Sequence, residues 1–143
     1  MTVNPVEDQD LITAHFDAQL AQTIYDDGVP APEDMTWVNN VLAPYVVVDY
    51  GMPIGSASGR SIAGEEKQPT LQRVGLSVIS SNSKFTRQVA GKIAEIGVGF
   101  VASANVGPLR LIGGGAFTIQ VEAKPEVYVS QVYFQYISNM TDV

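Results

Sequence analysis

The sequence predicts an α+β domain in which a mainly antiparallel four- to five-stranded sheet carries two principal helices packed on one face. Between Thr70 and Gly97 the apolar period changes from two to 3.6, which indicates a strand followed by an amphipathic helix. A β-branched run between Pro44 and Gly51 indicates an earlier strand, and alternating runs after Leu109 indicate later ones. This order of elements favours helices grouped on one face of a sheet.

Composition limits the class of protein. The chain has 143 residues, which fits one domain spanning residues 1–143 that buries roughly 68–70% of its unfolded surface. It has no cysteine, which excludes disulfide scaffolds, thiolate metal sites and cysteine nucleophiles. No apolar run reaches membrane-spanning length and no secretory leader follows Met1, so we expect no membrane partner. Charged residues are only 16% of the chain, which favours self-association.

The first helix is predicted to begin near Asp8 or Asp10, because either side chain can cap a helix and acids suit its first turn. It is predicted to end near residues 25–28, where a glycine follows two aspartates. Its apolar stripe is expected to comprise Leu11, Ile12, Phe16, Leu20 and Ile24.

The middle of the chain predicts a connector, a strand and a loop. Residues Met35–Leu42 are an irregular connector in which Trp37 is expected to be a packing anchor. The strand Pro44–Gly51 should be buried on both faces or lie centrally, and should pair with the strand that begins near Thr70. Residues 52–69 are too many for a tight hairpin, so we expect a long protruding loop there.

The turn Ser80–Ser83 predicts the start of the second helix, because serine and asparagine are favoured helix caps. We expect capping to account for both Ser81 and Ser83. The helix should end at Gly97, and its apolar face should close the core through Phe85, Val89, Ile93 and Ile96.

The last third of the chain predicts two further strands. Residues 109–121 alternate on either side of Gly113–Gly115, which forms a tight turn or a bend within one strand; we expect the bend or bulge. Residues Val127–Ile137 form the final strand, and a short polar tail runs from Ser138 to Val143. One face of that strand should hold Tyr128, Val132, Phe134 and Tyr136.

Charge is divided unevenly along the chain. The net charge is −7, yet residues 1–50 hold nine acids and no lysine or arginine, while residues 51–143 hold all eight bases and six acids. One interpretation is a solvated acidic surface that keeps the protein soluble. The other is that the acidic face of one copy meets the basic face of the next in a head-to-tail ring. Tight binding to a phosphate backbone is disfavoured because no positive patch is concentrated.

Motifs for catalysis are weak. Gly55–Ser61 differs from a phosphate-binding loop because it is one residue short and has arginine in place of lysine. Ser81–Lys84 matches the Ser-x-x-Lys of penicillin-recognising enzymes without their partner motifs. The single histidine, His15, lies beside Ile12 and Phe16, where a helix-face or core-edge position is favoured over general-base catalysis. We therefore expect no metal site, no cofactor and no enzyme activity.

The arrangement resembles the tail terminator and neck proteins of long-tailed bacteriophages. The resemblance rests on the acidic first helix, the strand Pro44–Gly51, the Gly/Ser-rich loop and the strand-then-helix segment. Within that segment the residues that carry it are Arg73, Lys84, Phe85, Arg87, Gln88, Val89, Ala90, Ile93 and Gly97. It spans roughly Asp8 to Ile137, and Ile96-Gly97 stands where the family often has a Leu-Gly pair.

The resemblance implies a virion structural protein of the tail or neck, assembled in the host cytoplasm. Such a subunit forms a ring, commonly a hexamer, that caps the tail tube, terminates its polymerisation and provides the head-attachment surface. The implied partners are other copies of the chain, the tail tube protein and a head-completion or connector protein. DNA would pass through the lumen without specific binding. Catalysis and cofactors are not implied.

We expect one subunit interface to join the outer stripe of the second helix to the acidic first third of an adjacent copy. Its residues are Lys84, Arg87, Gln88 and Lys92 on one side and Asp26 and Asp27 on the other. Two alternatives remain: another neck component, such as a head-closure or adaptor protein, and a dimeric α+β small-molecule-binding domain. In the second alternative the pocket lies between helix and sheet and uses Tyr128, Tyr133 or Trp37.

Overall fold

The computed structural model describes residues 5–26, 37–38, 41–51, 54–55, 67–104, 106–119 and 127–141. Two helices and eight strands are assigned within these ranges. In chain order they are α1 (Pro5–Gln19), β1 (Thr23–Tyr25), β2 (Trp37–Val38), β3 (Val41–Leu42), β4 (Tyr45–Tyr50), β5 (Ile54–Gly55), β6 (Lys67–Ser80), α2 (Ser83–Gly97), β7 (Arg110–Ile119) and β8 (Val127–Thr141).

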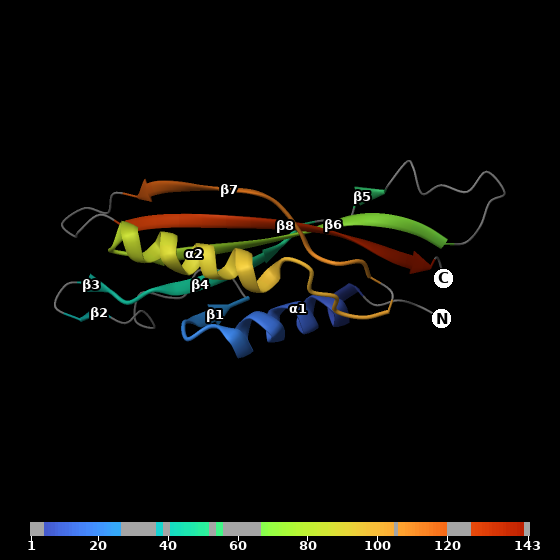
Figure 1. The fold of residues 1–143 in the computed structure, drawn as a ribbon, viewed down its shortest axis with the longest axis horizontal. Coiled ribbons are helices and arrows are strands. Elements are labelled where there is room, and N and C mark those ends of the chain that lie inside the picture. The colour runs from blue at the N-terminus through green and yellow to red at the C-terminus, as the bar shows by residue number, and fades with distance from the viewer. Residues whose placement is uncertain are drawn as a thin grey trace.

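One sheet forms the centre of the molecule. Its strand order is β1-β4-β6-β8-β7, and β5 pairs with β6 beyond the end of β4. The β1–β4 pair is parallel and the other pairs are antiparallel. Both helices lie on the same face of this sheet, β7 follows one long edge, and α1 and β1 follow the opposite edge (Figure 1). The predicted α+β class and mainly antiparallel sheet are confirmed.

The longest ladder joins β6 to β8, with registers from Lys67↔Thr141 to Ser80↔Tyr128. The predicted pairing of the strand around residues 44–51 with the one near Thr70 is also confirmed, since β4 runs antiparallel to β6. Strands β6 and β7 are both antiparallel to β8, so they run in the same direction and α2 connects them across the sheet. The α2 segment is therefore held between two fixed strand ends.

The main core lies between the helices and the sheet. Phe16 of α1 and Phe134 of β8 are fully buried, and their ring centroids are 5.8 Å apart. Other buried members of this core are Ile12, Leu20, Val46, Val48, Val74, Leu76, Val78, Val89, Ile93, Val106, Leu109, Val132 and Tyr136. Alternate residues of β4, β6 and β8 enter this core, as expected for a sheet with a helix-covered face.

The apolar stripe of α1 is narrower than predicted. Its buried apolar residues, Ile12, Phe16 and Leu20, recur every fourth residue. Leu11 is 47% exposed because it lies about 100° around the helix from Ile12. The helix ends at Gln19 rather than near residues 25–28, and Ile24 belongs to β1, where backbone pairing with β4 replaces helical bonding.

Asn82, rather than either serine, caps α2. Its side-chain Oδ1 accepts a hydrogen bond from the Phe85 amide at 3.0 Å. Ser81 instead accepts a bond from the Leu42 amide at 2.9 Å, and Ser80 donates to the Leu42 carbonyl at 3.3 Å. The prediction that capping accounts for Ser81 and Ser83 is wrong, because the turn also has to hold β3.

We expect Asn82→Ala to lower the free energy of unfolding by about 1 kcal/mol, since an orphan amide of the first turn loses its partner. Urea denaturation followed by circular dichroism measures the change. Lys84→Ala is the control, because Lys84 is exposed two residues further on and has no capping contact. Equal losses in the two variants would contradict a capping role for Asn82.

The inward face of α2 is rotated relative to the prediction. Its buried residues are Thr86, Val89, Ile93 and Gly97, whereas Phe85 is 40% exposed and Ile96 is half-buried. Thr86 fits against β8 because Ser130 donates a 3.0 Å hydrogen bond to its hydroxyl oxygen, and Thr86 donates to the Ser83 carbonyl. A short side chain with a hydrogen-bond partner fills the position predicted for Phe85.

A second apolar cluster lies around the β2–β3 hairpin. Residues 37–38 pair with 41–42, so the predicted irregular connector at 35–42 is wrong where the structure describes it. Trp37 packs against this cluster, which confirms it as a packing anchor. The buried members are Leu42, Tyr45, Ile79, Val127 and Val129. Tyr45 lies in this cluster and Val46 in the main core, so the start of β4 is buried on both faces, whereas Asp49 further along is exposed. Strand β4 has a neighbour on each side, which agrees with the predicted central position.

Three predictions concern strands β6, β7 and β8. A register shift between Leu111 and Gly113 confirms the bulge, and Gly113 has a φ of +147°. The predicted polar tail is wrong over 138–141, because β8 continues to Thr141 and Ser138 is fully buried. Within the predicted loop 52–69, residues 54–55 and 67–69 are strand; its other residues lie outside the described ranges.

Two buried tyrosines make polar contacts, Tyr50 of β4 with α1 and Tyr136 of β8 with β6. The Tyr50 hydroxyl donates to the Gln9 carbonyl at 2.7 Å and accepts from the Thr13 hydroxyl at 2.6 Å. The Tyr136 hydroxyl donates to Gln72 Oε1 at 3.3 Å. Burial raises the pKa of Tyr136 to about 12, and burial also raises the pKa of Tyr50 above its ordinary value. Both phenols therefore stay protonated near neutral pH and keep these donors.

Candidate assembly surfaces

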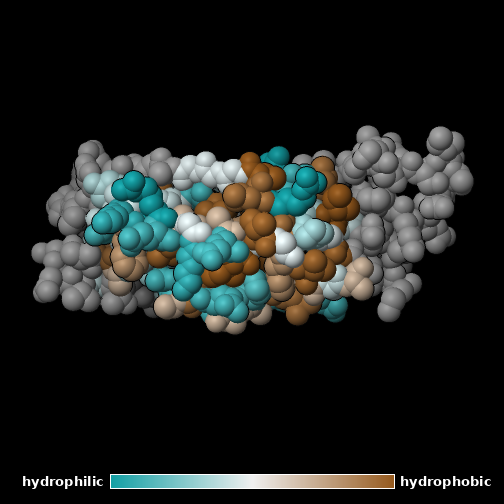
Figure 2. Space-filling model, viewed as in Figure 1, coloured by the Kyte–Doolittle hydropathy of each residue, from teal (hydrophilic) through white to brown (hydrophobic). Residues whose placement is uncertain are grey.

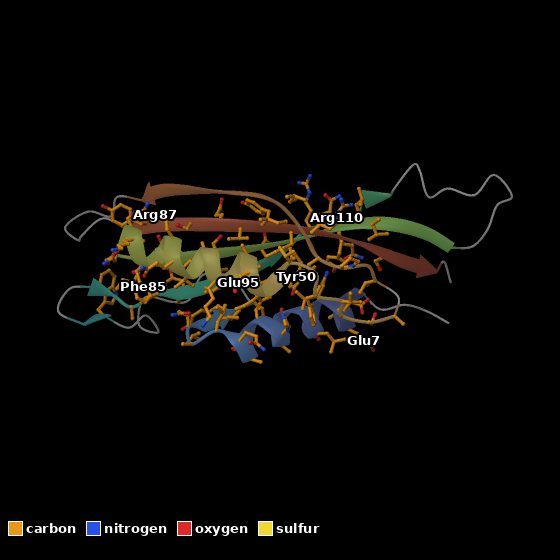
Figure 3. All side chains as sticks on the ribbon, in the orientation of Figure 1. Glu7, Tyr50, Phe85, Arg87, Glu95 and Arg110 are labelled. Carbon is orange, nitrogen blue, oxygen red and sulfur yellow. The ribbon has the colours of Figure 1, made fainter. Side chains whose placement is uncertain are left out.

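The outer stripe of α2 presents the four residues predicted for a subunit interface. Lys84, Arg87, Gln88 and Lys92 are all exposed. The Arg87 Nε donates to the Ser83 carbonyl at 3.4 Å, a bond within its own helix. Figure 3 places Arg87 and Phe85 at the same end of α2 and Glu95 further along the helix. The structure therefore gathers three positive charges on one outward surface.

The acidic partners predicted for that stripe lie elsewhere. Asp26 is exposed directly after β1, and Asp27 lies outside the described residues. Tyr25 pairs with Val47, so Asp26 follows at the level of Val48, near Tyr50. The basic stripe of α2 and Asp26 are thus on different elements of one protomer, as a head-to-tail contact between copies requires.

A hollow lies on the sheet face opposite the helices. Its volume is about 520 Å³ and it is lined by Asp49, Gly51, Arg73, Gly75, Ile112, Gly113, Gly114 and Tyr133. Strand registers explain its position, because Gly75 lies between Asp49 and Tyr133 on the neighbouring strands, and Tyr133 is followed by Gly113 on β7. Sequence reasoning missed this hollow because its four glycines, which come from three separate parts of the chain, meet only in the folded register.

Tyr133 partly covers the floor of this hollow. A Cβ atom on Gly75 would lie 2.9 Å from Tyr133 Cε1, so the ring sits directly over the glycine. The Tyr133 hydroxyl donates to Gln131 Oε1 at 2.9 Å, and Gln131 Nε2 donates to the Ser77 hydroxyl at 3.4 Å. This polar face carries the exposed charges of Asp49, Arg73 and Arg110.

The β7 edge exposes an apolar surface. Leu111 and Ile112 are 49% and 45% exposed, and Val98 and Val101, just after α2, are 55% and 49% exposed. Figure 2 shows apolar residues gathered beyond the end of α2, over the following loop and the start of β7. We call Val98, Val101, Leu111 and Ile112 the β7 patch. Apolar surface of this kind is typical of a contact with another molecule.

The residues named for the alternative small-molecule pocket are not brought together. Tyr128 and Tyr133 have opposite parity on β8 and therefore point to opposite faces of the sheet. Trp37 packs in the second apolar cluster. The expected pocket between helix and sheet is thus not built from these three side chains; the hollow that includes Tyr133 lies on the other face.

His15 has a structural environment. Its Nε2 is 3.1 Å from the Ile96 carbonyl oxygen, and its ring stacks on Phe100 with centroids 3.8 Å apart. It therefore joins α1 to the end of α2, in agreement with the predicted helix-face position. Among the described residues, no three His, Asp or Glu side chains are grouped closely enough to hold a metal ion. Neither described helix is long and apolar enough to cross a membrane.

Comparison with known proteins identifies a shared fold. No family model matches the sequence, and no curated protein matches it. The solved structures include a chain from the virion of a native gene transfer agent particle, which is similar with a TM-score of 0.61 at 16% sequence identity. The match covers 92% of this chain and 94% of that one. At this identity, the likeness shows that the two chains share a fold across almost their whole lengths.

Proposed function

We propose that the protein is a virion structural protein, and specifically the ring-forming subunit that caps a phage tail tube and terminates its polymerisation. The observation that carries the proposal is the fold shared, over nearly the full length of both chains, with a chain of a gene transfer agent virion. The sequence resemblance to tail terminator and neck proteins supports the finer role.

The distribution of surfaces supports a head-to-tail ring. The bases of α2 and the acids near α1 and β1 lie on different elements, so one copy offers a different surface to each neighbour. Contacts between unlike surfaces form closed rings when the rotation closes. In this proposal six copies form the ring, and its partners are the tail tube protein and a head-completion or connector protein.

The proposed role needs no catalysis and no cofactor, because capping a tube requires only surfaces that fit. The protein would act at the tail or neck of a virion after assembly in the host cytoplasm. DNA would pass through the ring without specific binding. The net charge of −7 fits that requirement, since it provides no net attraction to a phosphate backbone.

The test of the ring is native mass spectrometry with negative-stain electron microscopy of the purified protein over a range of concentrations. A six-membered ring with an open lumen is the expected result, and a compact dimer would contradict it. To separate a terminator from another neck component, the protein is added to tail tube protein that is polymerising. A terminator stops elongation, whereas a head-closure or adaptor protein leaves tube growth unchanged.

Charge reversal on the α2 stripe should weaken the ring. We expect Arg87→Glu with Lys92→Glu to raise the protein concentration needed for assembly by about tenfold, which corresponds to about 1.4 kcal/mol. The effect should shrink at high salt because exposed charges are screened. Sedimentation velocity at low and high salt measures it. The control is Arg87→Lys with Lys92→Arg, which preserves both charges; an unchanged assembly concentration in the reversed variant would contradict this interface.

A further inference from the structure

Strand β7 leaves one of its edges without a partner among the described residues. It pairs with β8 along one side and is the last strand of the sheet. From Leu111 to Ile119 its sequence contains no charged residue and no proline. Natural proteins usually protect an exposed edge strand with such residues, because its free backbone groups can pair with another chain. Apart from the bulge at Gly113, the described edge lacks these forms of protection, so we expect another molecule to cover it.

The β7 patch extends this edge. The Gly99 amide donates to the Leu109 carbonyl at 3.0 Å, and the Leu109 amide donates to the Phe100 carbonyl at 2.9 Å. These bonds hold the segment after α2 against the chain entering β7. Val98 and Val101 therefore lie near the start of the strand that exposes Leu111 and Ile112. Arg110, exposed at the first position of β7, adds a positive charge to the same end.

The opposite edge of the molecule presents complementary residues at the same level. One row across the sheet runs from Leu111 through Phe134 and Val74 to Tyr50. The Tyr50 hydroxyl then contacts α1 at Gln9 and Thr13, so the first half of α1 lies level with the start of β7. The exposed side chains of that half are Val6, Glu7, Asp10 and Leu11, which combine apolar and acidic groups.

Strand direction also suits a contact between these edges. Strand β1 is parallel to β4 and therefore antiparallel to β6, whereas β7 runs in the same direction as β6. When copies follow one another around an axis parallel to the strands, β7 of one copy meets β1 of the next in antiparallel orientation. Figure 3 shows Arg110 at the β7 edge and Glu7 at the α1 edge, at similar positions along the long axis.

We propose that the β7 edge of one copy docks against the α1–β1 edge of a second copy. Leu111 and Ile112 contact Val6 and Leu11, and Arg110 faces Glu7 and Asp10. The inference rests on the proposed ring and names its second contact, distinct from the α2 stripe. Charge complementarity selects this occupant, because the positive charge of Arg110 meets the acidic half of α1.

The absence of native cysteine allows a direct test by disulfide cross-linking. Two single variants of the full chain, Leu111→Cys and Leu11→Cys, are mixed in equal amounts and oxidised. Both positions are about half exposed, so neither substitution removes a core side chain. The expected product is a cross-linked dimer containing one chain of each variant. The matched control mixes Leu11→Cys with Ser77→Cys, which lies on the open sheet face and should give no cross-link.

A charge swap provides an independent measurement. We expect Arg110→Glu to raise the assembly concentration about tenfold. The double variant Glu7→Lys with Asp10→Lys should raise it by a similar factor. Combining all three substitutions in one chain should restore the wild-type assembly concentration. If the wild type forms rings but the cysteine variants give no mixed cross-link and the charge swap does not restore assembly, this contact is wrong and the proposed ring stands. Cross-links between two Leu111→Cys chains would overturn it in favour of symmetric β7–β7 pairing. Absence of any wild-type ring, with no cross-link, would overturn both proposals.

Discussion

Replacing Phe134 by alanine should lower the free energy of unfolding by about 3–5 kcal/mol. Phe134 is fully buried on β8, where its ring packs against Phe16 of α1 and lies beneath Gly97 of α2. Alanine would leave a cavity at the junction of both helices and the sheet, and such a junction cannot collapse without moving all three elements. At about 2–4 °C per kcal/mol, the melting temperature should fall by roughly 6–20 °C.

The matched control for this prediction is Tyr133→Ala, the preceding residue on the same strand. Tyr133 points to the open face, is 36% exposed and packs mainly over Gly75. Its loss should cost about 1 kcal/mol, because it removes a cross-strand contact without opening a core cavity. Urea denaturation at one fixed protein concentration compares the two, since assembly would otherwise change the apparent stability. Equal losses would show that the helix-covered face is not the main core.

Much of this fold could be predicted because its longest elements have clear apolar periods. The residues of β4, β6 and β8 alternate or run continuously, and α2 follows with Val89 and Ile93 at helical spacing. The bulge at Gly113 was predictable for another reason: three glycines interrupt an alternating strand without a turn pattern. Local sequence determines these features, so they did not depend on knowing the tertiary contacts.

The short strands could not be predicted from local sequence. Ile24 lies four residues after Leu20 and so continues the stripe of α1, yet pairing with β4 places it in a strand. Trp37 and Leu42 form a hairpin with only two residues in each strand, which leaves too few positions for a recognisable period. Tertiary pairing decides the structure at both places, and such pairing overrides weak local preferences.

The candidate surfaces also divide into those that local sequence predicts and those that depend on strand pairing. Helical spacing placed Lys84, Arg87, Gln88 and Lys92 on one outward surface, and the structure confirms their exposure. The hollow and the β7 patch depend on which strands become neighbours and which strand stays at the edge. That information resides in the register of the sheet, so no motif along the chain indicated either surface.

The packing between α2 and the core has consequences for assembly. His15 and Phe100 stack beside the end of α2, and the following backbone bonds position the segment that carries Val98 and Val101. The same helix presents the basic stripe on its outer side. A change that displaces α2 would therefore disturb both proposed contacts at once, whereas surface substitutions would affect one. This difference separates assembly defects caused by misfolding from those caused by a lost contact.

Gly97→Ala should destabilise the fold by about 1–3 kcal/mol, although alanine is the better helix former. A Cβ atom at this position would meet Phe134 Cζ, and would lie 2.7 Å from Phe134 Cε1 and 2.9 Å from Phe16 Cζ. Both rings are fully buried, so neither can move aside without displacing its own neighbours. The glycine is required because α2 approaches the two rings too closely for any side chain.

The same substitution at Gly91 is the matched control. Gly91 lies on the exposed side of α2, and a Cβ atom there would meet no atom within 4 Å. Gly91→Ala should therefore stabilise the protein by about 0.5–1 kcal/mol, because alanine loses less backbone entropy in a helix. Thermal and urea unfolding of the two variants should consequently shift in opposite directions. Stabilisation by both substitutions would contradict the close approach of α2 to the rings of Phe134 and Phe16. It would also contradict the large loss of stability expected for Phe134→Ala.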